Sequence, residues 1–392
     1  ANASLTLYNA GFRDYDTDKK LEYSKTRSAA AYEELPNLQM WIRVDDPDRT
    51  YAGELLRDEM LKLGIPLNAQ IADRSICYYH AWVAYDYHIY TGGWSWGREP
   101  DMYYDLFHSD KDTYPAASAD NYVRYHSQEL DPVAKLLKAP PDLATAKNAC
   151  DECQVIVHRD VAAIPLYTFA GFQAHRTYYG AFPGEAKYFN RTWEGFTNEL
   201  GYAFYSEWNP LNAHPQGFDK GGTFRQGLLI DIEKWSAVQA EWFYDWLVLD
   251  QIYDELLMYD PCNASRFVPW LAESYALGTW TTPSGPATKV RFHLRPNVLF
   301  HDDHPLTADD VEFTFEYMKA ELSPAWYYAV VMLDHATAVD DLTVDLYFKV
   351  QSVWALSWCM VCIIPQHIWE GKDSRTWMPE DYDKVIGSGP FR

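Results

Sequence analysis

The sequence predicts an α/β fold from two stretches in which strands and helices alternate. In the first, an apolar run (38–44) precedes an amphipathic segment (51–63) and a second apolar run (65–71), an order typical of a parallel strand–helix–strand unit. In the second, a segment of alternating apolar and polar residues (290–295) leads through two turns to a helix with a strong start signal.

The segment 51–63 predicts a helix because its apolar residues recur at helical spacing. Its inward face is expected to carry Ala52, Leu55, Leu56, Met60 and Leu63. Gly64 follows directly and predicts the end of the helix.

In the second stretch, a polar turn at 301–305 precedes the helix. Thr307 is the expected N-cap, with Asp310 three residues later as the capping acid. Alternation places Val290, Phe292 and Leu294 on the inner face of the strand, and helical spacing places Val311, Phe315 and Met318 in the core.

Four further elements follow from local signals. A helix is expected to end before Gly11, and a strand within 85–101 runs into a Gly-Gly loop. A second helix is expected at 143–157, and another strand at 162–172.

Three passages of the second half resemble family 5 of the extracellular solute-binding proteins, which deliver peptides, nickel or oligosaccharides to ABC importers. FHLRPNVLFHDDHPLTADDVEFTFEYM (292–318) is similar to the family signature, with Asp303 where the family usually has glycine. IIPQHIW (363–369) and VIGSGPFR (385–392) are similar to later family segments, in the usual order.

The first half resembles the C-terminal half of the same family, through LRDEMLKLGIPLN (56–68) and IPLY (164–167). The resemblance therefore implies a two-lobed fold like the periplasmic binding proteins (type II, cluster C), either circularly permuted or composed of halves of adjacent copies. The implied domains are the second lobe (1–160), a return to the first lobe (161–200), a bridge (201–220) and an incomplete first lobe (221–392). We expect further sequence or a second chain to supply the missing segment.

The formal net charge of −23 makes nucleic acid and anionic membrane surfaces poor partners. No apolar run reaches the roughly 18 residues of a membrane span. Because the family is exported, the resemblance implies an extracellular or cell-surface location. The 16 Trp and 30 Tyr predict either an aromatic core or a surface on which ligands stack.

The resemblance places a ligand cleft at the Gly-Gly loop. Trp94, Trp96 and Arg98 are the expected ligand contacts of one lobe, with core packing as the alternative for the tryptophans. Trp235, Tyr244 and Trp246 are the expected contacts of the other lobe, again with core packing as the alternative. Peptide-binding relatives carry an aspartate where Gly97 stands, so a sugar or another stacking solute stays open beside a peptide.

Six cysteines are present: Cys77, Cys150, Cys153, Cys262, Cys359 and Cys362. In an exported protein this even number favours disulfides over buried thiols, and both over a zinc site, without fixing the pairing. Asn2, Asn190 and Asn263 begin Asn-x-Ser/Thr triplets and are candidate glycosylation sites.

No catalytic motif emerges, so neither an enzyme activity nor a cofactor is expected. Asp14, Asp16 and Asp18 have the spacing of a calcium loop. However, Lys19 replaces the loop glycine, and Lys25 stands where a glutamate is needed, so a solvated turn is favoured over calcium.

Two hypotheses of function follow. In the first, the protein captures an oligopeptide or oligosaccharide between two lobes by hinge closure and delivers it to an ABC permease. In the second, it is a glycosylated extracellular filament or surface-layer subunit built on the same fold, in which neighbouring copies complete one another. The sequence alone leaves the ligand and the oligomeric state open.

Overall fold

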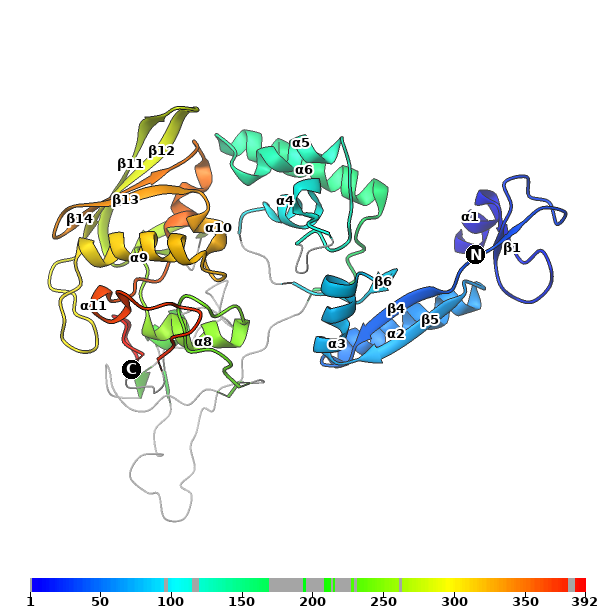
Figure 1. Cartoon of the computed structure of the whole chain (residues 1–392), viewed down its shortest axis with the longest axis horizontal. Coiled ribbons are helices and arrows are strands. Elements are labelled where there is room, and N and C mark those ends of the chain that lie inside the picture. Colours follow the sequence, from blue (N-terminus) through cyan, green and yellow to red (C-terminus); the bar gives the residue numbers. More distant parts are fainter. Residues whose placement is uncertain are drawn as a thin grey trace, which may run out of the picture. The chain divides into compact units, whose positions relative to one another are not determined.

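The computed structural model describes residues 2–94, 98–114, 120–168, 193–194, 208–212, 214–215, 227–228, 231–260, 263–379 and 385–392. They fall into two compact units (Figure 1). Unit 1 comprises Ala1–Lys138 and Ala144–Thr168, and unit 2 comprises Ala139–Leu143 and Phe169–Arg392. Both units contain helices and sheets, which confirms the α/β class. The permutation and the domain boundaries stay predictions.

Unit 1 contains the predicted parallel strand–helix–strand unit. Strand β4 (Leu38–Arg43) lies between β5 (Leu67–Ala72) and β6 (Ile89–Tyr90), and both neighbours run parallel to it. Helix α2 (Pro47–Lys62) connects β4 to β5, while α3 (Arg74–Tyr78) and the π-helical turn η1 (Tyr79–Ala84) lead to β6. The helix begins earlier than predicted because Asp46 caps it and Pro47 suits its first turn.

The predicted inward face of α2 is wrong at Leu55, whose exposed fraction is 50%. The buried residue of this helix is Gly53. A Cβ on Gly53 would lie 2.6 Å from Cγ2 of Ile42, so the helix meets β4 through a residue without a side chain. Periodicity of large apolar residues cannot reveal a contact made by glycine.

The remaining elements of unit 1 are α1 (Asn2–Ala10), β1 (Phe12–Arg13), β2 (Glu22–Tyr23), β3 (Glu33–Glu34), α4 (Met102–Phe107), the 3₁₀ turn η2 (Ser109–Lys111), α5 (Leu130–Lys138) and α6 (Leu143–Asp160). Gly11 follows α1 with φ +99°, as the helix-end prediction requires. The predicted strand at 162–172 is wrong over 162–168, which are mostly exposed and belong to no strand. Its last residues, 169–172, lie outside the described part.

Unit 2 is built on an antiparallel sheet with the order β11-β12-β14-β13. Its elements are α7 (Trp208–Asn212), α8 (Phe243–Ile252), β9 (Leu257–Asp260), β10 (Asn263–Pro269), β11 (Ala272–Thr282), β12 (Gly285–Leu294), α9 (Ala308–Glu321), α10 (Tyr327–Val330), β13 (Leu333–Asp340), β14 (Thr343–Phe348), the 3₁₀ helix η3 (Val353–Cys359) and α11 (Gln366–Trp369). A short strand pair, β7 (Trp193–Glu194) and β8 (His214–Pro215), is also described.

The predictions for 290–320 are confirmed. Val290, Phe292 and Leu294 are buried on β12, and α9 lies along the sheet with Val311, Phe315 and Met318 in the same core (Figure 1). The Thr307 N–H donates to Oδ2 of Asp310 at 2.9 Å, which is the reciprocal half of a capping box.

Candidate functional site

In unit 1 the carboxyl ends of β4 and β6 meet beside the start of α2. From β4 the chain passes to β5 on one side, then returns to β6 on the other side of β4. In open parallel sheets ligands bind at such a switch point, outside the carboxyl ends of the strands. We call residues 43–50 and 91–94 the carboxyl edge.

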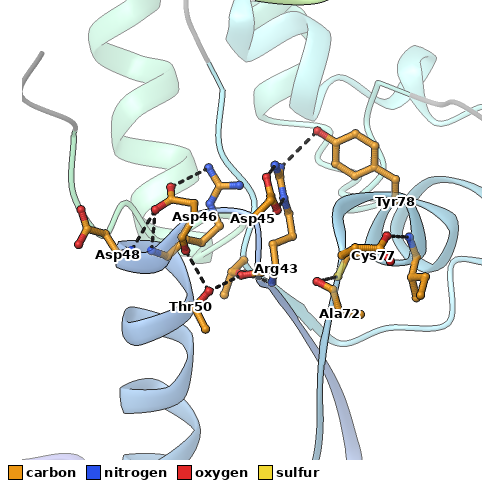
Figure 2. A network of polar contacts seen from close by, with 12 residues as sticks. Arg43, Asp45, Asp46, Asp48, Thr50, Ala72, Cys77 and Tyr78 are labelled. Atoms are coloured by element: carbon orange, nitrogen blue, oxygen red, sulfur yellow. Dashed lines mark hydrogen bonds and ion pairs between the residues drawn. The ribbon is translucent and has the colours of Figure 1, made fainter. Parts of the chain in front are cut away.

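A buried arginine organises the carboxyl edge (Figure 2). Arg43, with an exposed fraction of 6%, donates from Nε to Oδ1 of Asp45 at 2.9 Å and from Nη2 to the other carboxylate oxygen. Its Nη1 donates to the Tyr78 hydroxyl at 3.3 Å, and its backbone N–H donates to Oγ1 of Thr91 at 3.1 Å. The hydrogen bonds from Arg43 lower the pKa of Asp45, so the pair stays charged and fixed.

Residues of the carboxyl edge also fix the start of α2. The Asp46 carboxylate accepts from the backbone N–H groups of Asp48 at 3.0 Å and Arg49 at 3.2 Å, which satisfies two first-turn donors. Nη2 of Arg49 lies 3.6 Å from Oδ2 of Asp46. The Thr50 hydroxyl donates to the Arg43 carbonyl at 2.9 Å and so ties the helix to the strand.

Trp94 presents a partly exposed aromatic ring at this edge. Its exposed fraction is 42%, and its ring stacks on that of Tyr122 with centroids 5.6 Å apart. A Cβ on Gly92 would lie 2.6 Å from the Trp94 ring, and one on Gly93 would lie 2.6 Å from Nη2 of Arg49. The Gly-Gly pair therefore lets the indole and the guanidinium approach the backbone closely.

Of the other two predicted contacts of this lobe, the structure describes only Arg98. Trp96 lies outside the described residues, and Arg98 is half-buried beyond that gap. Sequence reasoning did not select Arg43 and Arg49, because their roles depend on which loops meet at the ends of β4 and β6.

A hollow in unit 2 is the second candidate surface. It is lined by Leu211, Asp250, Tyr253, Asp254, Glu255, Met258, Tyr259, Trp270, Trp326, Tyr328, Met360 and Pro390. Aromatic rings beside carboxylates suit a solute that carries amino or hydroxyl groups.

Among the polar residues of this hollow, Asp254 is half-buried and Tyr253 is buried. Burial raises the pKa of Asp254, whose carboxylate accepts from Nε1 of Trp270 at 2.7 Å and from Oγ of Ser388 at 2.9 Å. The hydroxyl of Tyr253 is buried without a hydrogen-bond partner among the described residues. A buried hydroxyl of this kind is a group that a bound polar atom can satisfy.

The residues predicted for this lobe, Trp235, Tyr244 and Trp246, are all half-buried and lie outside the lining of the hollow. Trp246 neighbours the hollow, because its ring packs edge to face with that of the lining residue Trp326, with ring centroids 4.9 Å apart. Nε1 of Trp246 donates to the Ala240 carbonyl at 3.0 Å, as expected of a packed tryptophan. The contact role of the three residues stays a prediction.

The predicted disulfides are wrong for the described cysteines, which all carry free thiols: Cys77, Cys150, Cys153, Cys359 and Cys362. Cys262 lies outside the described residues. Cys150 and Cys153 lie three apart on α6, where Cβ atoms are about 5–6 Å apart, too far for the roughly 3.8 Å of a disulfide. Cys359 and Cys362 are buried at the end of η3 and just beyond it.

The acidic turn at 14–18 brings carboxylate oxygens of Asp14, Asp16, Asp18 and Glu22 within 4.8 Å of one another. Carboxylates of this turn also accept hydrogen bonds from its backbone N–H groups. For example, the Thr17 N–H donates to Oδ1 of Asp14 at 2.6 Å. That this turn is solvated and holds no calcium stays a prediction.

The triplet asparagines Asn2 and Asn263 are exposed, and Asn190 lies outside the described residues. Glycosylation and the filament hypothesis stay predictions. Within the described residues, none of the helices combines the length and apolar character needed to cross a membrane.

Residues 266–392 match the model of the bacterial extracellular solute-binding proteins, family 5 Middle. This segment includes the signature-like stretch and the GSGPFR end. Residues 266–392 are therefore similar to this family. Proteins of the family bind solutes and are not enzymes, in agreement with the expectation from the sequence.

Similarity to individual proteins covers part of the chain. The chain is 28% identical over 196 residues to a probable peptide-binding protein, YejA, of Agrobacterium fabrum, covering 46% of this chain and 30% of that protein. Among solved structures, NikZ of Campylobacter jejuni with Ni(L-His) is 22% identical, covering 41% of this chain and 30% of that one, with a TM-score of 0.34. The mannohexaose-bound oligopeptide-binding protein of Thermotoga maritima is 32% identical, with a TM-score of 0.28. This similarity covers 36% of this chain and 25% of that one. The chain thus spans less than a third of the length of the curated relatives it matches.

Proposed function

We propose that this chain is part of an extracellular solute-binding protein that captures an oligopeptide and delivers it to an ABC permease. The family segment at 266–392 supports solute binding, and similarity to a probable peptide-binding protein supports a peptide. An oligosaccharide is the second solute class, because sugars as well as peptide side chains stack on exposed tryptophan.

The observation that carries this proposal is the exposed Trp94 ring at the carboxyl edge. One face of the indole stacks on Tyr122, and the Arg43–Asp45 pair fixes another part of the same carboxyl edge. A rigid aromatic surface loses little conformational entropy when a solute packs against it. Its place at the switch point of a parallel sheet is where such a contact is expected.

The test is isothermal titration of the natively purified chain with defined peptides of several lengths, and separately with oligosaccharides. We expect peptide binding that quenches tryptophan fluorescence, and at least tenfold weaker binding by Trp94→Ala. Tyr8→Ala is the matched control, because Tyr8 is an aromatic residue of similar exposure (47%) on helix α1, which is not part of the carboxyl edge. Binding of oligosaccharides alone would replace the solute class, and failure of both classes would contradict solute capture by this chain.

A further inference from the structure

The polar turn at 301–305 and the start of α11 bring together three residues that can bind a metal ion: Asp302, His304 and His367. One ligand atom from each lies within 4.8 Å of the others. Nε2 of His367 lies 2.7 Å from Oδ2 of Asp302, although these residues are 65 positions apart. The rings of His304 and His367 stack with centroids 3.9 Å apart and an interplanar angle of 17°.

Backbone contacts hold the turn that carries two of these residues. The Phe300 N–H donates to the His304 carbonyl at 2.8 Å, and the Asp303 N–H donates to the Phe300 carbonyl at 3.0 Å. Asp303 has φ +67°, a left-handed conformation that aspartate tolerates in turns. The spacing of Asp302 and His304 is therefore set by the fold of unit 2.

The segment that carries His367 is anchored to the same helix as the turn. The Gln366 N–H donates to Oδ1 of Asp310 at 3.0 Å, while Oδ2 of Asp310 accepts from Thr307, directly after the turn. Trp369, two residues beyond His367, is buried in the core. Both segments are thus fixed relative to the start of α9, which favours a preorganised site.

The donor set selects a class of ion. Two imidazoles and a carboxylate bind zinc and neighbouring divalent transition metals, with ligand bonds of about 2.0–2.2 Å. All three residues are exposed, so a fourth position is accessible to water. The nearby His301 is not part of this donor set, because its Nε2 contacts the Gly389 carbonyl oxygen at 2.7 Å.

We propose that Asp302, His304 and His367 form a surface site for a divalent transition metal of the zinc class. The site lies in unit 2 and does not depend on the proposed solute capture. Small side-chain rotations bring the three donors around one ion, which then replaces the direct contact between Asp302 and His367. Such an ion cross-links the turn to α11 and stabilises unit 2.

The test is titration of the full chain, purified without a histidine tag and dialysed against chelator, with Zn²⁺ alone. We expect one equivalent to bind and raise the melting temperature, and Co²⁺ to give visible absorption typical of a nitrogen and oxygen ligand set. His304→Ala and His367→Ala should each weaken Zn²⁺ binding at least tenfold. His304 lies on an exposed turn, so its variant keeps the test valid if His367→Ala does not fold.

His335→Ala is the matched control, because His335 forms an exposed pair with Asp334 at 2.7 Å but belongs to no three-residue cluster of the described chain. It should bind Zn²⁺ as the unaltered protein does. Absence of stoichiometric binding would overturn the proposal. So would binding that His304→Ala retains in full, since the ion would then be held elsewhere, for example by the acidic turn at 14–18.

Discussion

Gly387 lies so close to Ile252 that a Cβ on this glycine would be 2.0 Å from the Ile252 carbonyl oxygen. Gly389 donates its backbone N–H to the same oxygen at 2.8 Å. The GSG run is therefore held against the end of α8, beside the hollow of unit 2. Ser388 between the two glycines donates to Asp254, one of the lining residues.

Gly387→Ala should destabilise unit 2 by about 2 kcal/mol or more, because the added methyl group must displace backbone rather than a flexible side chain. Chemical denaturation followed by tryptophan fluorescence measures the change. Gly278→Ala is the control, since its Cβ would meet only the Lys289 carbonyl, at 3.9 Å. Equal stability of the two variants would show that the close contact is not rigid.

Asp310→Ala should lower the free energy of unfolding by about 2–3 kcal/mol. The buried carboxylate accepts from the backbone N–H groups of Thr307 and Gln366, so its loss leaves two donors without their partner. The exposed Asp309 in the same helical turn is the control, and its alanine variant should lose at most about 1 kcal/mol of helix-end electrostatics. Comparable losses would contradict the bridging role of Asp310.

Asp345 should make unit 2 sensitive to acid. Its burial raises the pKa, but hydrogen bonds from Arg291 and Lys289 outweigh this effect and lower the pKa to about 2 from the ordinary value of 3.8. Because the folded pKa is the lower one, the stabilisation is fully present above about pH 4 and is lost as the pH falls towards 2.

Asp345→Asn should therefore reduce the free energy of unfolding by roughly 2 kcal/mol at pH 7, and the difference from the unaltered protein should shrink near pH 2. Urea denaturation across this pH range is the measurement. Asp341→Asn, at an exposed position, provides the control. A difference that stays constant with pH would mean that the ion pairs contribute nothing through the charge of Asp345.

The buried thiols should resist modification in the folded protein. Burial raises the pKa of Cys77 to about 11 and that of Cys153 to about 12, and it raises those of Cys359 and Cys362 well above their usual range. At pH 8 a thiol reagent should label Cys150 first and these four only after unfolding. Peptide mapping by mass spectrometry reads out the order, and disulfide-linked peptides among the five would refute the free-thiol assignment.

Local patterns were enough for the elements whose signals lie within a few residues. The alternation at Val290 to Leu294 and the capping pair Thr307 and Asp310 predicted β12 and the start of α9, because side-chain direction and end-capping depend on neighbours along the chain. Large apolar residues misled at Leu55, where the helix contact is made by Gly53. The cysteine count misled as well, because pairing depends on the distance between Cβ atoms rather than on number.

The sequence by itself determined the α/β class, the similarity of residues 266–392 to family 5 and the loop that carries Trp94. Only the tertiary structure decided that Trp94 stacks on Tyr122, that Arg43 is buried against Asp45, and that His367 meets Asp302 across 65 positions. The physical reason is that secondary structure follows from short-range periodicity and turn chemistry. A site forms where distant segments converge, and that convergence depends on how the strands and helices pack.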